Sequence, residues 1–189
     1  MNTKDYSHLA WTEGSRERVF HTPIFDVYKA QRTSVEGKTA AFTLLECGNW
    51  VNIIPILKNP AGEECFLMVR QYRQGSGAIT LEFPGGLVDA GEGAREAALR
   101  ELQEETGYEA GDVFLAGESS PNPAFMANRC FTFIAQDLRK TAAQNLDENE
   151  LVEYELIPVR ELEKNMGRGV YDHAIMVVAY FWYERWKKG

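Results

Sequence analysis

Residues 86–108, which read GLVDAGEGAREAALRELQEETGY, decide how the rest of the chain is interpreted. The second half of this stretch, residues 94–106, consists of Ala, Leu, Glu, Gln and Arg apart from its closing Thr106, and these are good helix formers. Gly107 follows as a natural helix stop. The sequence therefore predicts a helix over 94–106 that is preceded by a loop rich in glycine.

Three glutamates of this predicted helix crowd one of its faces. At about 100° per residue, Glu101, Glu104 and Glu105 fall within one arc of roughly 100°, and Glu92 in the preceding loop can add a fourth carboxylate. Like charges at these spacings repel one another, so a cation is expected nearby. A solvated acidic face paired with the arginines of the helix is one interpretation. The other is a site for Mg²⁺ or Mn²⁺, which prefer oxygen ligands, completed by a phosphate substrate.

The same stretch closely resembles the Nudix box. The matching positions are Gly86, then Glu92 after five residues, and, after seven more, residues 100–108 (RELQEETGY), where Tyr108 replaces the usual bulky aliphatic residue. The resemblance implies an α/β fold, an α/β/α sandwich with a mixed β-sheet. In such a sandwich a loop and the box helix hold divalent metals against a diphosphate.

The resemblance also implies roles for individual residues. By position, Glu101 and Glu105 would be metal ligands, Glu104 would assist them, and the backbone carbonyl of Gly85 would be another ligand. Arg100 would orient the glutamates. The expected cofactor is Mg²⁺, with Mn²⁺ as the alternative, in two to three ions.

Residues outside the box resemble the branch of the family formed by ADP-ribose and nucleoside-diphosphate-sugar pyrophosphatases. Arg73 closes a Gln-Tyr-Arg run whose arginine faces the substrate phosphates in that branch, and its fork of donors suits this role. Glu82, within the run LEFPGG, is a candidate for substrate or dimer contacts, and Trp50 for stacking on a base. Residues 122–129 lack the Ser-Glu pattern of typical ADP-ribose enzymes, which leaves the sugar open.

An acidic loop at residues 147–150 (DENE) comes shortly before a predicted strand over 153–158. Composition alone is compatible with a solvated turn. The branch, however, presents a catalytic glutamate on a mobile loop at this place, where Glu148 is the better positional match and Glu150 the reserve. A carboxylate there would accept the proton of an attacking water or hold that water in line.

The resemblance therefore implies Mg²⁺-dependent hydrolysis of the diphosphate bond of a nucleoside diphosphate sugar. ADP-ribose, cleaved to AMP and ribose 5-phosphate, is the first choice. The alternatives are hydrolysis of GDP-mannose or another sugar nucleotide, hydrolysis of a dinucleoside polyphosphate, and a sensor that binds ADP-ribose without cleaving it.

A change of composition near Gly48 divides the chain into two predicted domains. Residues 1–48 form an N-terminal β subdomain, with strands over 25–32 and 39–45 around a turn at 34–38. The resemblance to the branch implies that this subdomain is a dimerisation element of a homodimer. Residues 49–189 form the Nudix hydrolase domain. Its further predicted elements are strands over 50–57, 65–72, 113–117 and 130–136 and helices over 159–165 and 172–187.

Composition places the chain among globular proteins with a sizeable core. Its 189 residues are 44% hydrophobic, and 20 Lys plus Arg against 28 Asp plus Glu give a formal net charge of −8. This acid excess argues against binding extended nucleic acid through a broad basic surface. The longest apolar run, residues 174–183, is too short to cross a bilayer, so no membrane partner is expected. The partner that the resemblance implies is a small-molecule nucleotide sugar.

The cysteines and histidines suggest no further chemistry. Cys47, Cys65 and Cys130 have neither the spacing of a zinc site nor that of a disulfide framework, which favours a reducing, cytoplasmic location. No Ser-His-Asp or Cys-His arrangement is legible among three histidines. His173, next to Asp172, is expected to have a structural role at the start of the last helix.

Overall fold

The computed structural model describes residues 4–189, which form two compact units. The first unit contains the chain up to Gly48 together with residues 120–128, and the second contains residues 49–119 and 129–189. Residues 120–128, which sequence analysis placed in the second domain, therefore belong to the first unit.

The first unit is a three-stranded antiparallel sheet in the order β1-β2-β3, preceded by a short 3-10 helix, η1 (Ser7–Leu9). β2 (Asp26–Ser34) and β3 (Thr39–Glu46) are the two predicted strands, whereas β1 (Trp11–His21) was not predicted because its largely polar sequence lacks a regular apolar alternation. Ala30 is the one buried side chain among residues 4–48. The unit on its own therefore has almost no core.

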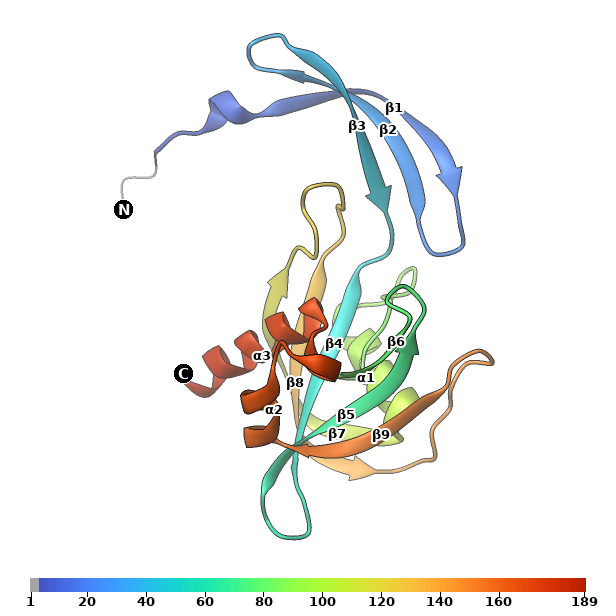
Figure 1. Cartoon of the computed structure of the whole chain (residues 1–189), viewed down its shortest axis with the longest axis vertical. Helices are drawn as coiled ribbons and strands as arrows, with labels where there is room; N and C mark the ends of the chain where they lie inside the picture. The colour runs from blue at the N-terminus through green and yellow to red at the C-terminus, as the bar shows by residue number, and fades with distance from the viewer. Residues whose placement is uncertain (1–3) are drawn as a thin grey trace. The chain divides into compact units, whose positions relative to one another are not determined.

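The second unit contains a mixed six-stranded sheet (Figure 1). Five strands follow the order β6-β5-β4-β8-β7, and β9 pairs with β5. Only the pairing of β4 with β8 is parallel among these described strands. The strands are β4 (Trp50–Lys58), β5 (Glu64–Arg73), β6 (Ala78–Glu82), β7 (Tyr108–Ser119), β8 (Cys130–Lys140) and β9 (Val152–Pro158).

Helices cover both faces of this sheet, which confirms the predicted α/β/α sandwich. Alternate residues of β4 point to opposite cores: Ile54 and Ile56 pack in the cluster that includes α3, while Val51 and Ile53 pack in the cluster that includes α1. Residues 65–69 of β5 are buried throughout, as expected for a strand covered on both faces. The helices are α1 (Ala94–Thr106), α2 (Val159–Asn165), η2 (Gly169–Tyr171) and α3 (Ala174–Lys187).

The predicted helices agree closely with the structure, and the strands agree less well. α1 and α2 have the predicted bounds, and Gly107 ends α1 in the left-handed conformation, with φ of 73°. α3 begins at Ala174, two residues later than predicted, β7 begins five residues earlier, and β6 was not predicted. No helix within residues 4–189 is both long enough and apolar enough to cross a membrane.

Candidate active site

A glycine pair sets the distance between β4 and the acidic face of α1. Gly86 exchanges backbone hydrogen bonds with Val51 of β4, at 2.9 and 3.1 Å. A Cβ at Gly85 would lie 2.2 Å from the carbonyl oxygen of Val51, and one at Gly86 would lie 2.3 Å from Glu101 Oε1. Larger residues would therefore push this loop away from the strand, the helix or both.

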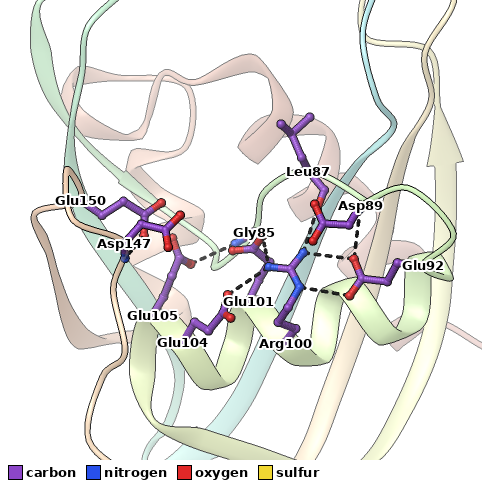
Figure 2. Close-up of polar contacts among 10 residues, drawn as sticks. All are labelled: Gly85, Leu87, Asp89, Glu92, Arg100, Glu101, Glu104, Glu105, Asp147 and Glu150. Atoms are coloured by element: carbon purple, nitrogen blue, oxygen red, sulfur yellow. Dashed lines mark hydrogen bonds and ion pairs between the residues drawn. The ribbon is translucent and has the colours of Figure 1, made fainter. Parts of the chain in front are cut away.

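Arg100 lies at the centre of the glutamates of the box (Figure 2). Its Nη1 donates to Glu101 at 2.9 Å and to Glu104 at 3.0 Å, while Nε and Nη2 donate to the two carboxylate oxygens of Glu92 at 3.0 and 3.1 Å. Nη2 also donates to the carbonyl of Leu87 at 3.0 Å. These hydrogen bonds lower the pKa of Glu92. The structure thus places Arg100 where it orients three carboxylates, consistent with the predicted role.

Glu105 and Glu101 are the carboxylates with the least favourable surroundings for a negative charge. The side chain of Glu105 is buried, and it accepts the backbone N–H of Gly85 at 3.0 Å. Burial, together with the charge of Glu101, raises the pKa of Glu105 well above its usual value. Burial also raises the pKa of Glu101, against the pull of Arg100. A cation close to both side chains would stabilise their ionised forms.

The donor set fits a hard divalent cation. Within residues 4–189, no three His, Cys, Asp or Glu side chains are already arranged as a metal cage, and Arg100 instead binds Glu101 and Glu104. The available donors are carboxylate oxygens, with a backbone carbonyl at Gly85 next to them, which are the ligands that Mg²⁺ and Mn²⁺ prefer. Because burial raises the pKa of Glu101 and Glu105, a cation bound there would favour their ionised forms.

The acidic loop reaches the same cluster. Glu150 donates its backbone N–H to the carbonyl of Asp147 and accepts the N–H of Asp147 through its side chain, at 2.9 and 3.2 Å. Figure 2 shows both residues beside Glu105, at the opposite end of the cluster from Glu92. The charge of Glu150 raises the pKa of Glu105. This geometry favours Glu150, the reserve candidate, over the neighbouring Glu148.

The segment before this loop is bound to the C-terminal end of α1, a feature that the sequence analysis missed. The Gln144 side-chain amide donates to the carbonyl oxygens of Glu105 and Val152, at 2.6 and 3.1 Å, and the backbone N–H of Asn145 donates to the carbonyl of Glu104 at 2.9 Å. The carbonyls of Glu104 and Glu105 lie in the last turn of α1 and have no partner within the helix. The signal in the sequence that could have indicated this binding is the pair of polar residues Gln144 and Asn145, between a strand and the acidic loop.

Arg73 and the buried Glu82 form a charge pair beside the cluster. Nε and Nη2 of Arg73 donate to the two oxygens of Glu82 at 2.8 and 2.7 Å, and the Thr80 hydroxyl donates to Oε1 at 2.6 Å. Burial alone would raise the pKa of Glu82, but the hydrogen bonds outweigh it and hold that pKa far below its usual value. Glu82 is 1% exposed, so it does not offer a free carboxylate to a substrate, contrary to the interpretation from sequence.

Two predicted substrate residues differ in how the structure connects them to the glutamates. The positive charge of Arg73 interacts with Glu105 and Glu150, so its guanidinium belongs to the same site. Trp50 lies at the start of β4, where its backbone N–H donates to the carbonyl of Arg129 at 2.8 Å and its strand bridges to Leu87. Trp50 is therefore next to the box loop, and its stacking role stays a prediction.

The comparison with known families agrees with this geometry. The model of the NUDIX domain matches residues 49–177, which is more than half of the chain. This chain belongs to the Nudix hydrolase family. The match confirms the family that the box residues predicted, and it includes the loop, α1 and the acidic loop described above.

Several proteins similar to this Nudix chain have names that refer to ADP-containing compounds. A crystal structure of an ADP compounds hydrolase has a TM-score of 0.83 and 26% sequence identity, and covers 99% of this chain and 98% of that chain. The ADP-ribose pyrophosphatase of Bacillus subtilis (strain 168) is 28% identical over 160 residues, 84% of each chain. The ADP-sugar pyrophosphatase of Mus musculus is 46% identical over 71 residues, so the match spans 38% of this chain and 31% of the mouse protein.

Proposed function

We propose that this Nudix chain hydrolyses the diphosphate bond of a nucleoside diphosphate sugar, with ADP-ribose cleaved to AMP and ribose 5-phosphate as the first choice. The observation that carries the proposal is the position of Arg73, an anion-binding side chain whose charge interacts with the buried Glu105, which in turn interacts with Glu101. Such a site offers both a cation-binding face and a phosphate-binding group. The names of the relatives support an ADP-linked substrate.

Each glutamate of the box has a role in this reaction. Glu101 and Glu105 would hold two to three Mg²⁺ ions, with Glu104 and the carbonyl of Gly85 as further ligands, and Arg100 would orient the carboxylates. These residues would thereby place positive charge next to the diphosphate, where it would offset the negative charge that develops during attack. The raised pKa values of Glu101 and Glu105 mean that these side chains favour such positive charge.

Water is the nucleophile, and the acidic loop would prepare it. The carboxylate of Glu150 interacts with Glu101, Glu105 and Arg73, which places it close to both the cation-binding and the phosphate-binding groups. It would accept the proton of the attacking water or hold that water in line, with Glu148 as the alternative. Arg73 would bind a phosphate oxygen through the N–H groups that Glu82 does not use.

A substrate panel tests the proposal directly. Purified protein with Mg²⁺ is offered ADP-ribose, GDP-mannose, other sugar nucleotides and dinucleoside polyphosphates, and nucleoside monophosphate release is measured by chromatography. We expect AMP release to be fastest from ADP-ribose and to stop with EDTA. Mn²⁺ replaces Mg²⁺ in a parallel series. Tight binding of ADP-ribose without release of any monophosphate would instead support a sensor and refute the catalytic proposal.

We also propose that the chain acts as a cytoplasmic homodimer. The support is the first unit, where Trp11, Phe20 and Phe42 are exposed on a sheet that has a single buried side chain, Ala30, among residues 4–48. A sheet of three strands needs a hydrophobic face covered to be stable. A second copy of the chain would supply that cover, and the free state of Cys47, Cys65 and Cys130 fits a reducing location.

A further inference from the structure

Each of the two oxygens of the Glu82 carboxylate has two neighbouring polar groups. Oε1 accepts Nε of Arg73 at 2.8 Å and the hydroxyl of Thr80 at 2.6 Å. Oε2 accepts Nη2 of Arg73 at 2.7 Å and lies 2.9 Å from Nδ1 of His173. Each oxygen therefore has one contact to Arg73 and one to a second residue. Thr80 lies on β6, the strand of Glu82 itself, whereas His173 lies just before α3.

The pairing with Glu82 leaves some of the N–H donors of Arg73 available to a ligand. A guanidinium has five N–H donors, and Glu82 receives two of them, which leaves three. The Glu82 side chain is 1% exposed, whereas the Arg73 side chain is 42% exposed. The open edge is thus formed by Nη1 and Nη2, whose parallel N–H groups match two oxygens of a phosphate. The orientation of that edge depends on the plane of the Glu82 carboxylate.

His173 is fixed by the helix that it precedes. It is the N-cap residue of α3, and its carbonyl accepts the backbone N–H groups of Met176 and Val177, at 2.9 and 3.1 Å. Its Nδ1 is shielded from solvent and lies 2.9 Å from the Glu82 carboxylate, outside good hydrogen-bond geometry. The buried carboxylate is therefore the charged group that this ring nitrogen faces. In this way α3 is connected to the phosphate-binding side of β5 and β6.

We propose that His173 is a positioning residue for substrate binding: with Thr80 it fixes the carboxylate of Glu82, and Glu82 fixes the guanidinium of Arg73 toward the diphosphate. The inference rests on the proposed function in that it assigns the diphosphate to Arg73. It reassigns Glu82 from a substrate contact to a link between His173 and Arg73. It also gives His173 a task beyond the structural one that its sequence position suggested.

Steady-state kinetics of AMP release from ADP-ribose test the proposal. We expect His173→Ala to raise KM about five- to tenfold while kcat stays within about twofold, because only the placement of a binding group is lost. His173→Asn should restore most of the loss, since its amide nitrogen falls near the position of Nδ1. Thr80→Val, which frees the other oxygen of Glu82, should raise KM in the same direction and provides a second variant if His173→Ala fails to fold.

A double-mutant cycle separates action through Arg73 from an independent effect. In an Arg73→Ala background, adding His173→Ala should leave KM unchanged, because coupled residues are not additive. Asp172→Ala, at the exposed neighbouring position, is the matched control and should keep the KM of the wild type. The dissociation constant of inorganic pyrophosphate with Mg²⁺, measured by calorimetry, gives a readout that needs no turnover and should rise with KM in His173→Ala.

The possible results are distinguishable. A wild type that releases AMP, with a His173→Ala variant of unchanged KM and a lowered Tm, would show a packing role alone and overturn the inference. Additive effects in the double-mutant cycle would overturn it as well. A wild type that releases no monophosphate, while His173→Ala and Arg73→Ala weaken pyrophosphate binding to the same extent, would refute the proposed function and leave His173 as a positioning residue.

Discussion

At the scale of single residues, Glu105 is the carboxylate on which we expect metal binding to depend most. Glu105→Gln keeps the shape of the side chain but removes its charge, and we expect kcat to fall by about two orders of magnitude or more. The Tm of the metal-free variant should not fall, because the substitution removes a charge from a buried site. Kinetics and thermal unfolding with and without Mg²⁺ measure both effects.

The matched control for this substitution is Glu96→Gln, on the exposed first turn of the same helix. It should leave both kcat and the Mg²⁺-dependent rise in Tm as in the wild type, whereas Glu105→Gln should reduce that rise. Equal kcat values for the two variants would contradict the role of Glu105.

The two candidate residues of the acidic loop give a second prediction at this scale. Glu150→Gln should lower kcat more than Glu148→Gln, because the charge of Glu150 interacts with Glu101 and Glu105. General acid–base residues typically contribute about 10²- to 10⁴-fold to a rate. Comparison of kcat at saturating ADP-ribose decides between them. A larger loss of kcat in Glu148→Gln would instead assign the role to Glu148, the better positional match.

At the scale of elements, Glu82 joins β6 to β5, and this link should depend on pH. Its folded-state pKa lies far below its usual value, so its contribution to stability is present above the unfolded-state pKa and is lost as the pH falls toward the folded one. We expect Glu82→Gln to lower the free energy of unfolding by about 1–3 kcal/mol at pH 7. By pH 3 the difference from the wild type should shrink by about 1–2 kcal/mol.

Urea unfolding of both proteins at pH 7 and pH 3 measures this difference. Other carboxylates titrate over the same range, but they are shared by the two proteins, so the difference between them isolates Glu82. A difference that stays constant with pH would contradict the assignment of the lowered pKa to this residue.

The contact between β7 and α3 depends on a glycine. A Cβ at Gly117 would lie 2.2 Å from ring carbons of Trp182, so Gly117→Ala must displace the indole or the helix. We expect a loss of about 1–3 kcal/mol in the free energy of unfolding, as for other overpacked sites. Gly75→Ala, where no atom lies within 4 Å of the added Cβ, should change stability by less than about 0.5 kcal/mol. Similar Tm values for the two variants would show that α3 adjusts freely.

At the scale of the whole molecule, the first unit is the part for which we propose a partner subunit. Light scattering after size-exclusion chromatography should give twice the monomer mass, and Phe20→Asp, at an exposed apolar position of β1, should shift the equilibrium toward the monomer. Leu115→Asp, a similarly exposed position of β7 in the second unit, is the control and should leave the mass unchanged. A monomeric wild type would refute the proposed dimer.

What the sequence predicted and what it missed differ in their physical origin. The bounds of α1 were predictable because helix-forming residues and a terminal glycine act locally, and the box identified Glu101 and Glu105 as a cluster. β1 was missed because its residues carry little periodic signal. The contact of His173 with Glu82 was out of reach as well, since residues 91 positions apart meet only through the packing of α3 against the sheet.

The binding of residues 141–145 to the end of α1 also limits how this protein can change in length. A Cβ at Gly107 would lie 2.2 Å from the carbonyl oxygen of Ala142, and Asn145 bonds the backbone of Glu104, so this segment follows the helix end residue by residue. An insertion there would shift the acidic loop past the glutamates. An insertion between Asn145 and Val152 would leave that binding intact but would displace Glu150 from the same cluster. Variation in loop length among descendants of this chain is therefore expected to avoid residues 141–151.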